Sequence, residues 1–229
     1  MNDTLASTPL RFKTICRHNE EVKTAIEAVD RLGLLRATSN LMRIVKVQIS
    51  IAALVLLSFI VQHWLVFPLE QQFLPSDDLS FASLLFIPHG VKLVLAFVVG
   101  ILALPGLLIG QFLAGLLLGT PLDLALITAV IGSLAVMLPV LLVRYMQSIP
   151  FTTSLAETTH AVSIAKAFFV VTVIASLLNS MFHGVLFHHE GSNILELRYL
   201  TGDILGAAFV LLTLVVIRRL NRLFTQRGE

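Results

Sequence analysis

Long apolar runs separated by short polar segments make up most of the chain from residue 47 onwards. A run of about 20 apolar residues is the length at which a helix crosses a bilayer. The pattern therefore predicts an all-α integral membrane protein with about six transmembrane helices. The expected spans are 47–67, 81–102, 106–119, 124–143, 167–187 and 199–217.

The stretch 81–119 differs from the other apolar runs because it is slightly too short for two full spans and a turn. It carries one charge in 39 residues, Lys92. We expect a tight hairpin that turns at Pro105 and Gly106, with a broken or re-entrant region at Pro88, His89 and Gly90. Such non-helical backbone is tolerated at membrane depth where protein or a wet cavity covers it.

The polar ends of the chain define three regions. Residues 1–43 are polar and mixed in charge, and 19–35 within them has the apolar spacing of a short amphipathic helix. We expect 1–43 to be a cytoplasmic N-terminal segment, 44–217 the transmembrane helical domain, and 218–229 a basic cytoplasmic tail.

Composition and charge support this reading. The chain is 56% hydrophobic and 13% charged, which excludes an ordinary soluble domain and a disordered chain. Eight basic residues fall in 1–46, two in 144–166 and four after 217, whereas the expected outer loops hold only Arg198. By the positive-inside rule, both termini are cytoplasmic and the number of crossings is even. Membrane lipid is the expected surrounding, and nucleic acid is not an expected partner.

No residue pattern in the chain predicts catalysis or a cofactor. The sequence has no GxSxG, HExxH or phosphate-loop motif, so we expect no enzymatic activity. The lone Cys16 excludes an intrachain disulfide and a CxxC metal site. We expect no metal and no cofactor, because His183, His188 and His189 are not spaced to share one helix face.

Ionisable side chains inside the expected spans provide the candidate site. Charges at membrane depth are costly and usually face the interior of a helix bundle. Lys92 and Asp203 are near enough in depth to pair, and other polar residues occupy the same half of the spans. One interpretation is a cavity for a small polar or anionic ligand; the other is a neutralising ion pair with ordinary interhelical hydrogen bonds. The candidate ligand-binding residues are His89, Lys92, Asn179, His183 and Asp203.

Small residues recur at four-residue spacing, which lets helix backbones approach closely. They serve packing within the chain or an oligomer. The sets are Gly106, Gly110 and Ala114; Gly115 and Gly119; and Gly202 and Gly206.

Three short elements resemble those of a known family. They are Phe86-Ile87-Pro88-His89-Gly90; Pro105 and Gly106 with Gly110; and Tyr199 followed by Gly202, Asp203 and Gly206. In order and spacing they resemble the membrane-associated sensor domain of the first type, which precedes histidine kinase or diguanylate cyclase modules in bacterial inner membranes. The resemblance implies a sensory role and shared structural positions at Pro88, Gly90, Pro105, Gly106, Gly110, Gly202 and Gly206.

The sequence also departs from that family. Phe86 and Ile87 stand where the family has a tryptophan, and His89 is not its usual residue. No output domain follows Ile217 in this sequence, so any signal is expected to pass to a separate protein partner.

Three function classes follow from these observations. The leading one is a non-enzymatic sensor-like protein for signal transduction, multi-pass in the bacterial inner (plasma) membrane. It would bind an unknown small ligand in the outer half of the bundle and act on a separate signalling module. The second is a small-molecule permease or a substrate-binding transporter subunit. The third is a structural or assembly subunit of a membrane complex.

Overall fold

The computed structural model describes residues 40–73, 83–146, 161–187 and 192–226, and all regular secondary structure in these residues is helical. The chain divides into two units, Met1–Val47 and Gln48–Glu229. Of the first unit, residues 40–47 are described, and they are helical. The predicted amphipathic helix at 19–35 lies outside the described residues. The second unit contains every contact discussed below.

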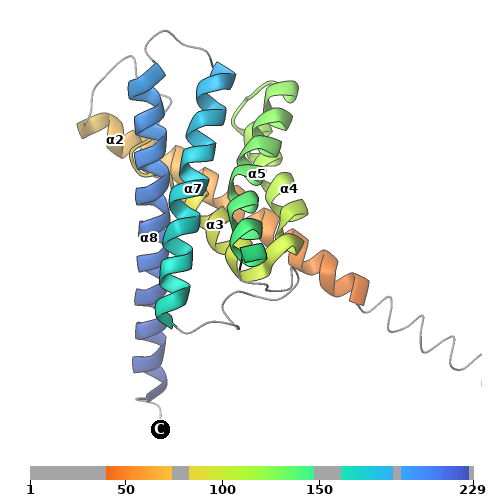
Figure 1. The fold of residues 1–229 in the computed structure, drawn as a ribbon, viewed down its shortest axis with the longest axis vertical. Coiled ribbons are helices and arrows are strands. Elements are labelled where there is room, and N and C mark those ends of the chain that lie inside the picture. The colour runs from red at the N-terminus through yellow and green to blue at the C-terminus, as the bar shows by residue number, and fades with distance from the viewer. Residues whose placement is uncertain (1–39, 74–82, 147–160, 188–191, 227–229) are drawn as a thin grey trace, which may run out of the picture. The chain divides into compact units, whose positions relative to one another are not determined.

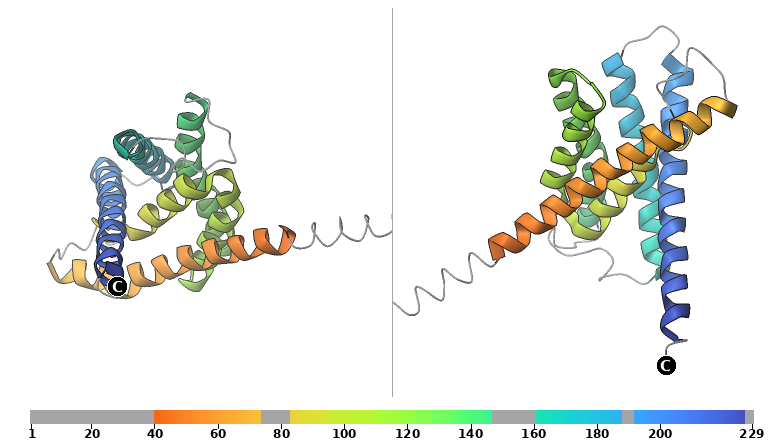
Figure 2. Two further views of the ribbon diagram at one scale, coloured as in Figure 1. Left: turned by 90° about the horizontal axis from the view of Figure 1, so that it is seen from below. Right: turned by 180° about the vertical axis from the view of Figure 1, so that it is seen from behind.

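The helices follow one another along the chain. The first helix occupies 40–61. It continues into η1 (Gln62–Val66) and α2 (Phe67–Phe73), and the later helices are α3 (Ile87–Val99), η3 (Gly100–Ala103), α4 (Leu104–Leu117), α5 (Leu122–Met146), α7 (Ala161–Phe187) and α8 (Ser192–Gln226). In space α7 lies beside α8, and α4 lies beside α5 (Figure 1). From Gln48 onwards the first helix runs obliquely across the others (Figure 2).

Five helical stretches are long and apolar enough to cross a membrane, which makes the chain a multi-pass membrane protein by length and composition. They are Asn40–Phe73, Ile87–Leu117, Leu122–Met146, Ile164–Val185 and Glu196–Thr225. Large apolar side chains are exposed along them, for example Leu126, Leu138 and Leu212. Lipid is the solvent that such surfaces require, because water would make this exposure costly.

The stretch Ile87–Leu117 is not one straight helix. The side-chain nitrogen Nζ of Lys92 lies 2.8 Å from Oε1 of Gln111. In a straight helix these residues would be separated by about 28 Å along the axis, at about 1.5 Å per residue. The chain therefore reverses direction between α3 and α4.

The reversal occurs at a glycine, a few residues before the predicted position. Gly100 has a φ of 75°, in a region that residues with a side chain avoid. The 3-10 turn Gly100–Ala103 follows, and Nε2 of Gln48 donates to the carbonyl oxygen of Leu102 at 2.6 Å. Pro105 and Gly106, where the turn was predicted, belong to the first turn of α4. A proline is well tolerated there, because the first backbone N–H groups of a helix have no partner within it.

The predicted break at Pro88, His89 and Gly90 is also displaced. All three residues are helical and occupy the first turn of α3. The non-helical backbone precedes them, at residues 83–86. There the N–H of Phe86 donates to the carbonyl oxygen of Gly202 on α8 at 3.0 Å, so protein covers this irregular segment.

Two helices extend beyond the predicted membrane spans, because the predicted bounds follow the apolar residues alone. The first span was predicted to end at residue 67, but the helix continues through Pro68 to Phe73. The π-helical turn Gln62–Val66 makes this continuation feasible: the N–H of Phe67 donates to Gln62 O, five residues earlier, and the wider turn accommodates the proline. Helix α8 likewise extends beyond the predicted 199–217 at both ends. In α5, Pro139 is buried and does not interrupt the helix.

Two of the three small-residue sets correspond to close backbone packing within the chain. A methyl group on Gly106 would contact Ile51, and one on Gly110 would contact Ala52, both on the first helix. A methyl group on Gly202 would collide with the carbonyl oxygen of Ser83, and one on Gly206 with that of Phe86. The small residues therefore let α4 approach the first helix and let the 83–86 segment lie on α8.

Candidate ligand site

Asp203 lies at the centre of a polar cluster formed by α3, α7 and α8. Its side chain is fully buried. Nδ2 of Asn179 on α7 donates to its Oδ2 at 2.7 Å. Nδ1 of His89 on α3 lies 3.3 Å from the same oxygen. These three residues were predicted as site residues from the sequence, and the structure brings them together.

Close packing of glycines places His89 beside Asp203. A methyl group on Gly90 would collide with Gly206 O and the backbone of Ala207, so the start of α3 lies directly on α8. His89 precedes Gly90, and Asp203 precedes Gly206 by less than one turn. Gly90 therefore packs directly on Gly206, which follows Asp203 on α8.

Several buried polar atoms of this cluster have no hydrogen-bond partner among the described residues. They include Oδ1 of Asp203, Oδ1 of Asn179, both ring nitrogens of His89 and Oγ of Ser176. Each of these four side chains is at most 2% exposed. An unpaired buried polar group costs about 1–3 kcal/mol, so such atoms concentrate where water or a ligand completes the bonding.

Lys92 belongs to a second polar cluster, one turn along α3 from His89. Its Nζ donates to Oε1 of Gln111 at 2.8 Å and approaches the carbonyl oxygen of Gly132 at 3.3 Å. Nε2 of Gln111 in turn donates to the carbonyl oxygen of Thr128 at 2.8 Å. Gly132 has no side chain that would occupy the position of the Gln111 amide.

The expected contact between Lys92 and Asp203 is therefore replaced by two separate sets of partners. Within the described residues, the carboxylate oxygen Oδ2 of Asp203 lies 3.3 Å from Nδ1 of His89. Lys92 follows His89 by three residues on the same face of α3, but its side chain reaches α4 and α5. The two clusters share α3 and differ in the helices that complete them.

A cavity of about 210 Å³ lies beside the Asp203 cluster. His183 and Tyr199 form part of its wall, and their ring centres are 5.1 Å apart. Nδ1 of His183 lies 2.8 Å from the carbonyl oxygen of Asn179. The remaining lining is mostly aromatic: Phe59, Phe67, Phe86 and His63, together with Leu118, Gln62 and Ser83.

A third polar group holds the irregular 83–86 segment. Oε1 of Glu70 accepts the hydroxyl proton of Ser83 at 2.7 Å and the N–H of Leu85 at 2.9 Å. Nε2 of Gln62 donates to Oγ of Ser83 at 2.9 Å, and Oε1 of Gln62 accepts the N–H of Ile87 at 3.0 Å. These bonds satisfy backbone groups that no helix satisfies, as backbone at membrane depth requires.

The sequence alone predicted no role in either cluster for Gln62, Glu70, Gln111 or Gly132. For Gln111 the sequence does contain a signal, because a side-chain amide inside an apolar run needs hydrogen-bond partners. The carbonyl oxygen of Gly132 had none, because a backbone acceptor leaves no trace in the sequence. Among the described residues, no group of three or more histidine, cysteine, aspartate or glutamate side chains is placed to hold a metal ion.

Comparison with protein-family models, with curated proteins and with solved structures found no match for this chain.

Proposed function

We propose that this chain is a non-enzymatic membrane receptor that binds a small polar ligand at the Asp203 cluster. The ligand changes the position of α8, and a separate protein partner detects that change. The observation that carries the proposal is that one oxygen each of Asp203 and Asn179, buried between helices, has no hydrogen-bond partner in the described part of the chain.

The packing of α8 supports the path from the site to a partner. Asp203 and Arg218 belong to one continuous helix, Ser192–Gln226. They are separated by about 22 Å at about 1.5 Å per residue. Near Asp203 the helix is tightly packed, with Gly202, Gly206 and Ala207 buried. A displacement at the tightly packed half is carried to the other half, because a continuous helix moves as one element.

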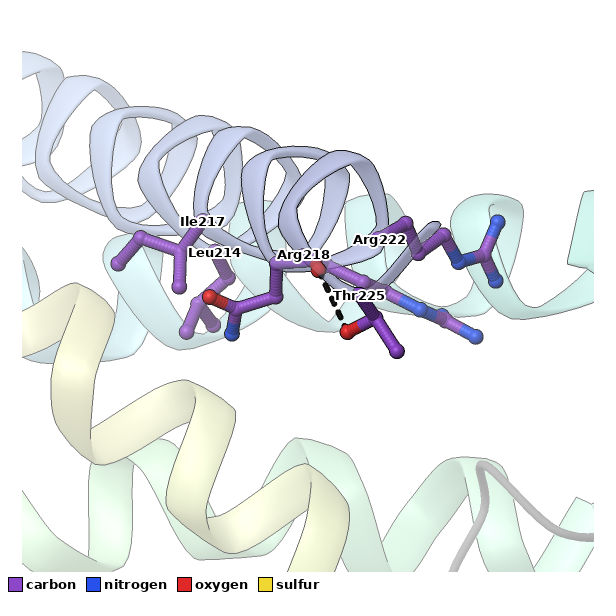
Figure 3. Close-up of a pocket in the computed structure, with 6 residues that line it drawn as sticks. Leu214, Ile217, Arg218, Arg222 and Thr225 are labelled. Carbon is purple, nitrogen blue, oxygen red and sulfur yellow. Dashed lines mark hydrogen bonds between the residues drawn. The ribbon is translucent and has the colours of Figure 1, made fainter. Parts of the chain in front are cut away.

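The far half of α8 is open on every side. All residues from Leu211 to Thr225 are exposed in the described part of the chain. Leu214 and Ile217 line an open groove with Arg218, Arg222 and Thr225 (Figure 3). Apolar residues and arginines thus follow one another along one face of the helix. This end is the proposed contact surface for the partner.

The hairpin of α3 and α4 supports an even number of crossings. Each helix has only 13 or 14 residues, fewer than the roughly 20 that span the bilayer. A re-entrant pair that returns to its side of entry, or two short crossings, leaves both chain ends on the same side. We propose that this side is the cytoplasm of a bacterial inner membrane, in agreement with the distribution of basic residues.

Paired spin labels test the proposed coupling without a ligand. In a Cys16→Ser background, Tyr145→Cys and Arg222→Cys place labels on the exposed ends of α5 and α8. Asn179→Leu and Asp203→Asn alter the site, and we expect each to shift the distance between the labels by about 1–2 Å, as helix shifts in receptors do. Thr213→Val, on the exposed half of α8, is the matched control and leaves the distance unchanged. Identical distance distributions in both site variants contradict the proposal.

A small-molecule permease is a second candidate, and the non-helical backbone at 83–86 favours it. Transporters place irregular backbone beside their binding sites. Uptake by vesicles that contain the purified protein separates the two functions, because a receptor moves no solute. Solute accumulation above that in protein-free vesicles would favour the permease.

A further inference from the structure

The arrangement of unpaired atoms indicates which ligand fits the cluster. Asp203 and Asn179 already bind each other through Oδ2 and Nδ2. Their remaining oxygens, both named Oδ1, are acceptors with no partner among the described residues. A ligand that binds these two oxygens therefore has to donate hydrogen bonds. An anion offers only acceptor atoms and would meet the Asp203 carboxylate directly.

Two residues of the cavity wall lie on the same helix faces as Asn179 and Asp203. His183 follows Asn179 by four residues on α7, and Tyr199 precedes Asp203 by four residues on α8. Residues four apart lie one above the other on a helix, about one turn or 5.4 Å apart. His183 and Tyr199 of the cavity wall therefore lie about one helical turn from Asn179 and Asp203, on the same faces of α7 and α8.

The size and lining of the cavity indicate which group of the ligand would occupy it. A volume of about 210 Å³ holds one ring-sized group, since a cavity of about 150 Å³ accommodates benzene. The aromatic side chains of Phe59, Phe86 and Tyr199 favour an apolar or aromatic group there. The ammonium of Lys92 is hydrogen-bonded to Gln111 and to the carbonyl oxygen of Gly132.

We infer that the site takes a small primary amine with one ring or a short apolar chain. Its amino N–H groups donate to Oδ1 of Asp203 and Oδ1 of Asn179, and its apolar part occupies the aromatic cavity. This inference rests on the proposed receptor function and adds the class of the ligand.

Binding of three probes of similar size tests the class. The probes are 2-phenylethylamine, 2-phenylethanol and 3-phenylpropanoate, each measured by saturation-transfer NMR on the full chain in nanodiscs, with empty nanodiscs subtracted. In the amine, two carbons separate ring and nitrogen, which suits the distance of one helical turn. We expect the amine to bind at least tenfold more tightly than the alcohol, and the carboxylate not to bind.

Variants of the site locate the binding. Asp203→Asn and Asn179→Leu should each weaken amine binding at least tenfold, while Thr213→Val keeps it within twofold. Asn179→Leu removes the acceptor and leaves an apolar side chain, so it keeps the test valid if Asp203→Asn does not fold. Absence of amine binding, equal binding of the carboxylate, or unchanged binding in Asn179→Leu overturns the inference. If the spin-label distances still respond to the site variants, the receptor function stands and only the ligand class is rejected.

Discussion

The two polar clusters on α3 are one helical turn apart and yet differ in how completely they are hydrogen-bonded. The Lys92 cluster is closed: the ammonium has Gln111 and Gly132 as partners, and the amide of Gln111 reaches Thr128. The Asp203 cluster is open, because Asp203, Asn179 and His89 all retain atoms without a hydrogen-bond partner among the described residues. Both are buried, so exposure to solvent does not explain the difference.

The difference suggests that the Lys92 cluster has a structural role and that the Asp203 cluster has a binding role. A closed cluster stabilises one arrangement, here the reversal that brings α4 against α3 and α5. An open cluster leaves free energy that a bound molecule can recover. The ion pair that the sequence suggested would have merged these two roles, and the structure divides them between two sets of neighbouring helices, α4 and α5 for Lys92 and α7 and α8 for the Asp203 cluster.

Breaking the closed cluster should have the largest effect on stability. Gln111→Leu leaves the ammonium of Lys92 buried with one acceptor fewer, and the loss of a hydrogen-bond partner by a buried charged group costs about 3 kcal/mol or more. We expect a loss of this size in the free energy of unfolding, measured by denaturant titration in detergent micelles.

A double variant provides the control for that measurement. Lys92→Met together with Gln111→Leu replaces both polar partners by apolar groups of similar size, which is often nearly neutral. The double variant should therefore be more stable than Gln111→Leu alone. A double variant that is less stable than the single one would show that Lys92 has another essential partner.

Obstructing the backbone contact between α8 and the 83–86 segment should have an intermediate effect on stability. Gly206→Ala places a methyl group against the carbonyl oxygen of Phe86, which is backbone and cannot turn aside. Overpacking of this kind costs about 1–3 kcal/mol. Gly115→Ala is the matched control, because its methyl group meets only the side chain of Ala125 closely and the thermal unfolding midpoint should change less. Equal losses in the two variants would show that 83–86 does not depend on contact with α8.

The smallest effects on stability are expected from two serine substitutions, one at the hydrogen bonds of the 83–86 segment and one in the Asp203 cluster. Ser83→Ala removes the hydroxyl that links Gln62 to Glu70 and should cost about 1 kcal/mol. Ser176→Ala removes an unpaired buried hydroxyl and should leave the unfolding midpoint unchanged or raise it slightly. If Ser176→Ala costs as much as Ser83→Ala, that hydroxyl has a partner and the open cluster is smaller than proposed.

The sequence by itself determined the helices, their apolar exposure and the residues that could not face lipid. Apolar runs and isolated charges are local properties, so Lys92, Asp203, His89 and Asn179 could be identified as interior residues without any coordinates. The glycine spacings likewise predicted close packing, and the structure places Gly106 and Gly110 against the first helix and Gly202 and Gly206 against 83–86. The inner-membrane location and the sensory role remain predictions.

The tertiary structure alone decided which polar groups meet. The turn at Gly100 depends on a backbone angle, and the 2.8 Å contact between Lys92 and Gln111 depends on that turn. The acceptor at Gly132 is a backbone atom, and Pro68 is accommodated by a π-helical turn. Which groups form hydrogen bonds depends on how distant segments are placed in space. The sequence shows that a buried polar group needs a partner, but it does not show which partner it has.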